Sequence, residues 1–151
     1  MKYVRGYVSS IIPDSKTLVI ELCGCKHACQ NCGNRFRQVE EGQPLDERLD
    51  MIIGMFEKTV DVVCFVGGEN DMQTLQSMFT FIHKKGLKTA LSTAYPETSM
   101  VNRRLTEVLD YILIGRCDTK QKILKKDYSP FGDIEDWIEI KGQETSNYVD
   151  T

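Results

Sequence analysis

No apolar run in this chain of 151 residues is long enough to cross a bilayer, which takes about 20 residues. The first stretch, "MKYVRGYVSSIIPD", lacks the apolar core and the small-residue cleavage site of a secretory signal peptide. The net charge is only −3, so we expect neither nucleic acid nor a membrane surface as a partner. These absences favour the reducing cytoplasm, where a disulfide framework is not expected.

Histidine is scarce, and a second group of metal-ligand pairs is missing. The two histidines are His27 and His83, and no further C-x2-C or H-x3-H pair is present. Structural zinc normally takes four ligands in two such pairs. The cysteines around His27 could still supply four ligands locally, so a noncatalytic zinc-binding module remains an alternative. The chain also has no internal repeat, low-complexity segment or linker, which predicts one domain over residues 1–151.

The sequence does contain an alternation of apolar runs and helical stripes. Continuous apolar runs predict strands at 17–22, 61–66, 87–93 and 111–115. Apolar residues at three- and four-residue spacing predict helices over 45–58 and 72–85, and a shorter one around 101–108. The alternating stretch 136–141 is a candidate edge strand. This order predicts an α/β fold with a mostly parallel sheet covered by helices.

Two polar motifs follow neighbouring strands of this predicted sheet. A cysteine-rich stretch comes directly after strand 17–22, and "GGEN" (67–70) comes directly after strand 61–66. In parallel α/β folds, ligands bind at the carboxyl ends of the strands. We therefore expect both motifs to lie at the functional edge of the sheet.

Four of the six cysteines lie within "CGCKHACQNC", from residue 23 to residue 32. Cys25, Cys29 and Cys32 have the spacing C-x3-C-x2-C. A 4Fe–4S cluster usually has four thiolate ligands, so three would leave one iron with an open position. An open position is typical of a catalytic metal rather than a structural one. The other cysteines are interpreted as small buried residues: Cys23, Cys64 and Cys117.

A C-x3-C-x2-C motif after the first strand, with Gly-Gly-Glu after the second, resembles the radical S-adenosylmethionine (SAM) enzymes. The resemblance implies a partial, open (β/α) barrel. It also implies that the three cysteines hold a 4Fe–4S cluster whose fourth iron binds SAM, and that one-electron reduction then yields methionine and a 5′-deoxyadenosyl radical. The implied SAM contacts are Asn31, Cys32, Gly33, Gly67, Gly68, Glu69 and Ser92.

Further stretches resemble the activating proteins of anaerobic (class III) ribonucleotide reductase. Asn34 lies two residues after Cys32, the last cysteine of the motif. "VLDYILIGRCD" is similar to a strand of that family, and "IKGQETSNYVDT" is similar to its ending. The Asp-Gly-Pro-Gly lead-in of that family is absent, and "GGEN" replaces its Gly-Gly-Glu-Pro. The resemblance implies an activase that generates a glycyl radical on the reductase, with a one-electron donor such as flavodoxin. A small radical SAM enzyme acting on another peptide or a small molecule is the other alternative.

Overall fold

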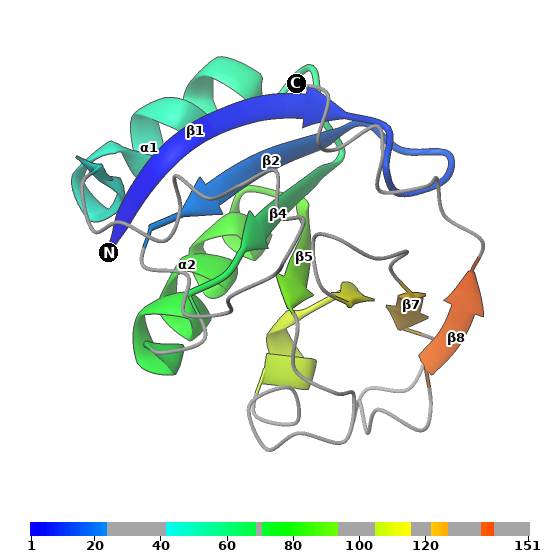
Figure 1. Cartoon of the computed structure of the whole chain (residues 1–151). Helices are drawn as coiled ribbons and strands as arrows, with labels where there is room; N and C mark the ends of the chain where they lie inside the picture. Colours follow the sequence, from blue (N-terminus) through cyan, green and yellow to red (C-terminus); the bar gives the residue numbers. More distant parts are fainter. Residues whose placement is uncertain (24–41, 69–70, 94–104, 116–121, 127–136, 141–151) are drawn as a thin grey trace.

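The strands form one sheet, and both α-helices cover the same face of it (Figure 1). The structure is a computed structural model that describes residues 1–23, 42–68, 71–93, 105–115, 122–126 and 137–140. Within that part of the chain there are eight strands: β1 (Lys2–Ser9), β2 (Thr17–Leu22), β3 (Gln43–Pro44), β4 (Val62–Val66), β5 (Lys88–Thr93), β6 (Tyr111–Ile114), β7 (Lys122–Lys126) and β8 (Trp137–Ile140). The helices are α1 (Leu45–Phe56), α2 (Met72–Lys84) and the short 3₁₀ helix η2 (Thr106–Val108).

The centre of the sheet is parallel and its two sides are antiparallel. The strand order is β3-β1-β2-β4-β5-β6-β7-β8. β2, β4, β5 and β6 pair in parallel and confirm the four strands predicted from continuous apolar runs. The strands at either side pair antiparallel, and β8 confirms the candidate edge strand. The described sheet is therefore mixed, and the predicted parallel arrangement is confined to its centre.

The two predicted long helices are confirmed, and a side-chain cap marks the start of α2. In α1, Leu45, Leu49 and Ile53 are buried at four-residue spacing. Asp71 caps α2 by accepting a hydrogen bond from the Thr74 amide at 3.2 Å. Of the helix predicted around 101–108, the structure describes only Leu105 and η2. None of the helices in the described ranges is both long and apolar enough to span a membrane.

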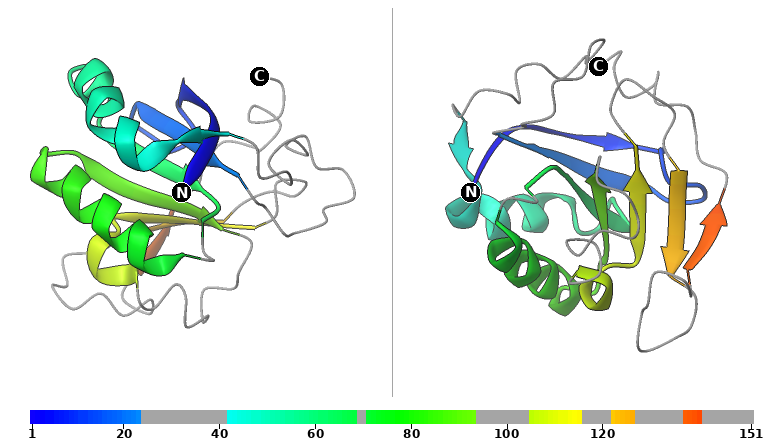
Figure 2. Two further views of the ribbon diagram at one scale, coloured as in Figure 1. Left: turned by 90° about the vertical axis from the view of Figure 1, so that its left-hand side faces the viewer. Right: turned by 60° about the horizontal axis from the view of Figure 1, so that its bottom comes forward.

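The sheet separates two groups of buried side chains. The face covered by the helices carries the larger core, where the rings of Phe65 and Phe79 lie 5.1 Å apart. The second face carries a smaller apolar group, which includes Val19, Cys64 and Ala90. Cys64 is fully buried, as predicted. In the described part of the chain both α-helices lie on one side of the sheet, and the strands turn progressively from β1 to β8 (Figure 2).

An irregularity in β1 decides which of its side chains reach each face. Tyr3 and Arg5 are opposite the consecutive β2 residues 22 and 21, so Val4 is an extra residue in β1. A bulge of this kind reverses the alternation of side chains along a strand. Tyr3 consequently packs against the helix-side core, whereas Tyr7 packs against the second face.

Candidate metal centre

Only part of the predicted site lies within the described residues. The predicted cluster ligands Cys25, Cys29 and Cys32 lie outside them, and so do Asn31, Gly33, Glu69 and Cys117. Gly67, Gly68 and Ser92 are described. Within the described ranges, no group of three His, Cys, Asp or Glu side chains is arranged to hold a metal ion. Gly67, Gly68 and Ser92 lie at the edge of the sheet where β2 ends, just before the cysteine-rich segment.

The parallel strands end at one level, which we call the carboxyl edge. In the sheet register Glu21 pairs with Val66, Val66 with Ser92, and Ser92 with Leu113. The Gly67 amide donates to the Ser92 carbonyl oxygen at 3.2 Å. The structure therefore confirms that the cysteine-rich segment and the Gly-Gly turn leave the sheet at the same edge. It also brings Gly67 beside Ser92.

The conformation of Gly68 explains why this position needs glycine. Its φ is +86°, and a Cβ there would lie 2.5 Å from Leu22 Cδ1 and 3.3 Å from Leu75 Cδ2. A side chain would be strained by the backbone and would also overlap the core. The glycine thus lets the turn after β4 pack directly against the last residue of β2, just ahead of the cysteines.

Cys23 and Gly42, the residues that flank the cysteine segment (24–41), both lie at the start of β1. The Cys23 amide donates to the Lys2 carbonyl oxygen at 3.0 Å, and Tyr3 pairs with Leu22 on one side and Gln43 on the other. A Cβ on Gly42 would overlap the Cys23 sulfur. Cys23 is partly buried rather than fully buried.

Sequence reasoning missed a charged cluster at the same edge. Glu21 is fully buried. Its carboxylate accepts hydrogen bonds from Arg5 Nε, from Arg5 Nη2 at 3.1 Å and from the Tyr7 hydroxyl at 3.2 Å. The Arg5 guanidinium also lies 5.2 Å from the centre of the Tyr7 ring. The available signal was a single acid inside the apolar run "TLVIEL", because a buried charge needs a partner.

The environment of Tyr7 keeps its hydroxyl protonated. Burial raises the pKa of Tyr7 well above its ordinary value, and the negative charge of Glu21 raises it further. The positive charge of Arg5 lowers the pKa of Tyr7 but does not offset these two effects. Tyr7 is therefore a hydrogen-bond donor to Glu21 throughout the physiological pH range. Arg5 and Glu21 therefore place a charged group on the second face, at β1 and β2.

Ser92, the predicted hydroxyl contact, ends β5 together with Thr93. Their side chains are both buried, with 4% of Ser92 and 2% of Thr93 exposed. The Thr93 carbonyl oxygen accepts a hydrogen bond from the Gly115 amide at 2.9 Å. Backbone hydrogen bonds thus connect the ends of neighbouring strands along this edge.

The donor set suits an iron–sulfur cluster. The three predicted ligands belong to one stretch of sequence, and the residues before and after it, Leu22 to Cys23 and Gln43, pair with the start of β1. Thiolate sulfur is the usual ligand of iron–sulfur clusters. The Gly67–Gly68 turn follows β4 at the same edge, next to the end of β2. The described residues are therefore compatible with a cluster and a cosubstrate at this edge.

Comparison with known proteins gives one match. The family model described as "4Fe-4S single cluster domain" matches residues 16–130, a span that runs from β2 through β7 and leaves out β1 and β8. No curated protein and no solved structure matches the chain.

Proposed function

The chain belongs to the 4Fe-4S single cluster domain family, and from this we propose that it is a radical SAM activating enzyme. The proposal rests on one observation: the end of β2, which precedes the cysteine segment, lies at the same edge of the sheet as the Gly67–Gly68 turn and Ser92. We assign the cluster to Cys25, Cys29 and Cys32, in a partial, open (β/α) barrel. With three cysteine ligands, the cluster would keep one iron available to SAM and supply the electron that cleaves it.

The residues of this chain would bind and orient SAM. Glu69 and the carbonyl groups after β4 are acceptors for its ammonium group, which needs hydrogen-bond partners once it leaves water. The hydroxyl of Ser92 is assigned to the carboxylate or the ribose. Asn31 and Gly33 flank the third cysteine and are assigned to the adenine. These contacts follow the family resemblance.

A large protein partner suits this small chain. Most of the described residues belong to one sheet and its helices. A primary carbon radical abstracts hydrogen from whatever it meets, so water and stray groups must be excluded. A partner that covers the carboxyl edge and inserts its own reacting segment would complete that enclosure. Glycine suits such a segment because it allows close approach of the backbone.

The partner we propose is an anaerobic ribonucleotide reductase in a reducing cytoplasm. One electron from a donor such as flavodoxin and one SAM would give methionine and a 5′-deoxyadenosyl radical. That radical would take one hydrogen atom from a glycine Cα of the reductase. The products would be methionine, 5′-deoxyadenosine and a glycyl radical on the reductase.

Anaerobic reconstitution with iron and sulfide, followed by reduction with SAM, tests the proposal. We expect 5′-deoxyadenosine as a product and a glycyl signal by electron paramagnetic resonance when the reductase of the same genome is added. Cys25→Ala, Cys29→Ala and Cys32→Ala should each remove both. SAM cleavage without a glycyl signal would contradict the activase role alone, and a colourless protein that binds zinc would contradict the proposal as a whole.

A further inference from the structure

The start of β1 holds both ends of the cysteine segment by backbone pairing. On one side Cys23 donates to the Lys2 carbonyl oxygen at 3.0 Å. On the other side Tyr3 pairs with Gln43, and Lys2 with Pro44. β2 and β3 lie on opposite sides of β1, and both run antiparallel to it. The chain therefore runs in the same direction where it leaves the sheet after β2 and where it re-enters at β3.

Cys23 and Gly42, the residues that flank the segment, are in direct contact. A Cβ on Gly42 would overlap the Cys23 sulfur and would lie 2.6 Å from the Tyr3 carbonyl oxygen. Real Cβ atoms do not approach a backbone oxygen this closely, so a side chain at position 42 must displace residue 42 from Tyr3 and also disturb its contact with Cys23. Gly54 is the opposite case, since a Cβ there meets nothing within 4 Å.

We propose that Cys23 and Gly42 form a clasp that positions the cysteine segment for its cluster, and that Cys23 is a packing residue rather than a ligand. The proposal rests on the assignment of the cluster to that segment. β1, which completes the clasp, lies outside the residues matched by the family model. The family match therefore does not include the strand that completes the clasp.

The physical reason for a clasp is the entropy of closing the segment. Bringing the ends of a free segment together costs conformational entropy. When the folded sheet already holds the ends, cluster binding does not have to supply that closure. Weakening the clasp should therefore reduce retention of the cluster with all three ligands intact. Residues that orient metal ligands from outside typically change metal affinity by about 10- to 100-fold.

The test compares Gly42→Ala with Gly54→Ala, both in the full chain after anaerobic reconstitution. Measured quantities are iron and sulfide per chain, the rate of iron loss to a chelator and thermal unfolding of the cluster-free protein. We expect Gly42→Ala to lose iron roughly tenfold faster than the parent and Gly54→Ala to lose it at the parent rate. Equal rates for Gly42→Ala and the parent would overturn the clasp.

Substitutions at Cys23 provide an independent readout if Gly42→Ala does not fold. Cys23→Ser keeps a side chain of similar size against Gly42 but removes the thiol, so it should keep the parent's iron content. Cys23→Leu enlarges the side chain that touches Gly42 and should lose iron faster. Loss of the cluster in Cys23→Ser, with unchanged unfolding of the cluster-free protein, would make Cys23 a ligand and overturn the proposal. Because no readout uses SAM, failure of the activase role would leave these results unaffected.

Discussion

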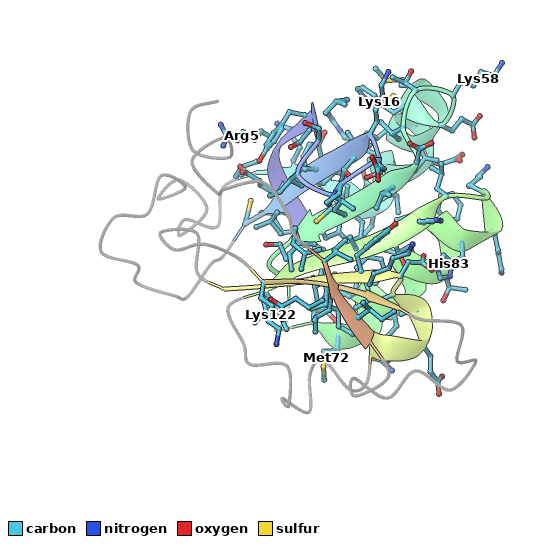
Figure 3. The ribbon with its side chains drawn as sticks, turned by 90° about the vertical axis from the view of Figure 1, so that its right-hand side faces the viewer. Arg5, Lys16, Lys58, Met72, His83 and Lys122 are labelled. Carbon is cyan, nitrogen blue, oxygen red and sulfur yellow. The ribbon has the colours of Figure 1, made fainter. Side chains whose placement is uncertain are left out.

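The two edges of the sheet are built by different means. At the amino ends of the strands, side chains fasten the turns: Asp110 Oδ2 accepts hydrogen bonds from the Thr89 amide at 2.9 Å and lies 2.9 Å from His83 Nε2. Backbone hydrogen bonds connect strand ends at both edges, but at the carboxyl edge the positive-φ glycines Gly67, Gly68 and Gly115 follow β4 and β6 directly. Figure 3 shows Arg5 toward the end where β2 stops, and Lys58 and His83 toward the other.

We expect this difference to separate substitutions that affect stability alone from substitutions that also affect the proposed site. Side-chain hydrogen bonds at the amino edge hold α2 and the strands β5 and β6 together. At the carboxyl edge, Gly68 lets the turn after β4 pack directly against Leu22, the last residue of β2. Arg5, Glu21 and Tyr7 also form a side-chain cluster near this edge, and Glu21 lies two residues ahead of Cys23 in the chain. Substitutions at the two edges should therefore affect different properties.

The largest effect is expected from Gly68→Ala at the carboxyl edge. Backbone strain and overlap with Leu22 act together, so the free energy of unfolding should fall by about 3–4 kcal/mol. Gly86→Ala is the matched control, because φ is +80° there and a Cβ meets nothing within 4 Å. The control should cost about 1 kcal/mol. Urea unfolding of both cluster-free variants measures the difference, and equal losses would show that packing against Leu22 is unimportant.

Arg5→Met should have the next largest effect. It leaves the fully buried Glu21 without its cation, and we expect a loss of about 2–3 kcal/mol in the free energy of unfolding. The loss is smaller than for a fully buried pair because the Arg5 side chain is 28% exposed. Lys85→Met breaks the exposed pair with Asp50 and should change stability by less than about 0.5 kcal/mol. Recovery in Arg5→Met/Glu21→Leu would confirm the cause; continued loss would contradict it.

Asp110→Ala tests the amino edge. The amide of the buried Thr89 loses its acceptor, which should lower the free energy of unfolding by about 1–2 kcal/mol. Iron content after reconstitution should stay at the parent value, because this edge is remote from the cysteine segment. Thermal unfolding and iron analysis of the same preparation check both parts. Loss of iron without loss of stability would reverse the assignment of the two edges.

The smallest effect is expected for the cap of α2. The Thr74 hydroxyl and amide donate to Asp71 and hold the pKa of its carboxyl below the ordinary value. A lowered pKa contributes stability that is complete above the ordinary aspartate pKa and is lost as the pH falls through the lowered value. Asp71→Ala should cost about 1 kcal/mol at neutral pH and progressively less in acid. A pH-independent difference in urea unfolding would exclude the carboxylate as the cause.

The sequence predicts the centre of this fold better than its sides. β2, β4, β5 and β6 are continuous apolar runs, and the buried stripes of α1 and α2 repeat at helical spacing; both signals are strong because they need only local pattern. β1 gave no such signal, since the bulge at Val4 breaks its alternation. β7 is mostly lysine, "KILKK", and β3 has only two residues.

The candidate site divides in the same way. Cysteine spacing and the Gly-Gly turn are local patterns, and their common edge follows from strand order. The contacts of Gly42 with Cys23, and of Arg5 with Glu21, depend on how β1 pairs with its neighbours. Residue spacing cannot predict how β1 pairs, because each of these contacts joins residues that are far apart in the chain.

The central claim is that the carboxyl edge holds a three-cysteine cluster with one iron open to SAM. Electron paramagnetic resonance of the reduced, reconstituted protein, recorded with and without SAM, tests it most directly. We predict that SAM changes the cluster signal, because it binds the open iron, and that Cys25→Ala removes the signal. An identical cluster signal with and without saturating SAM would contradict the claim.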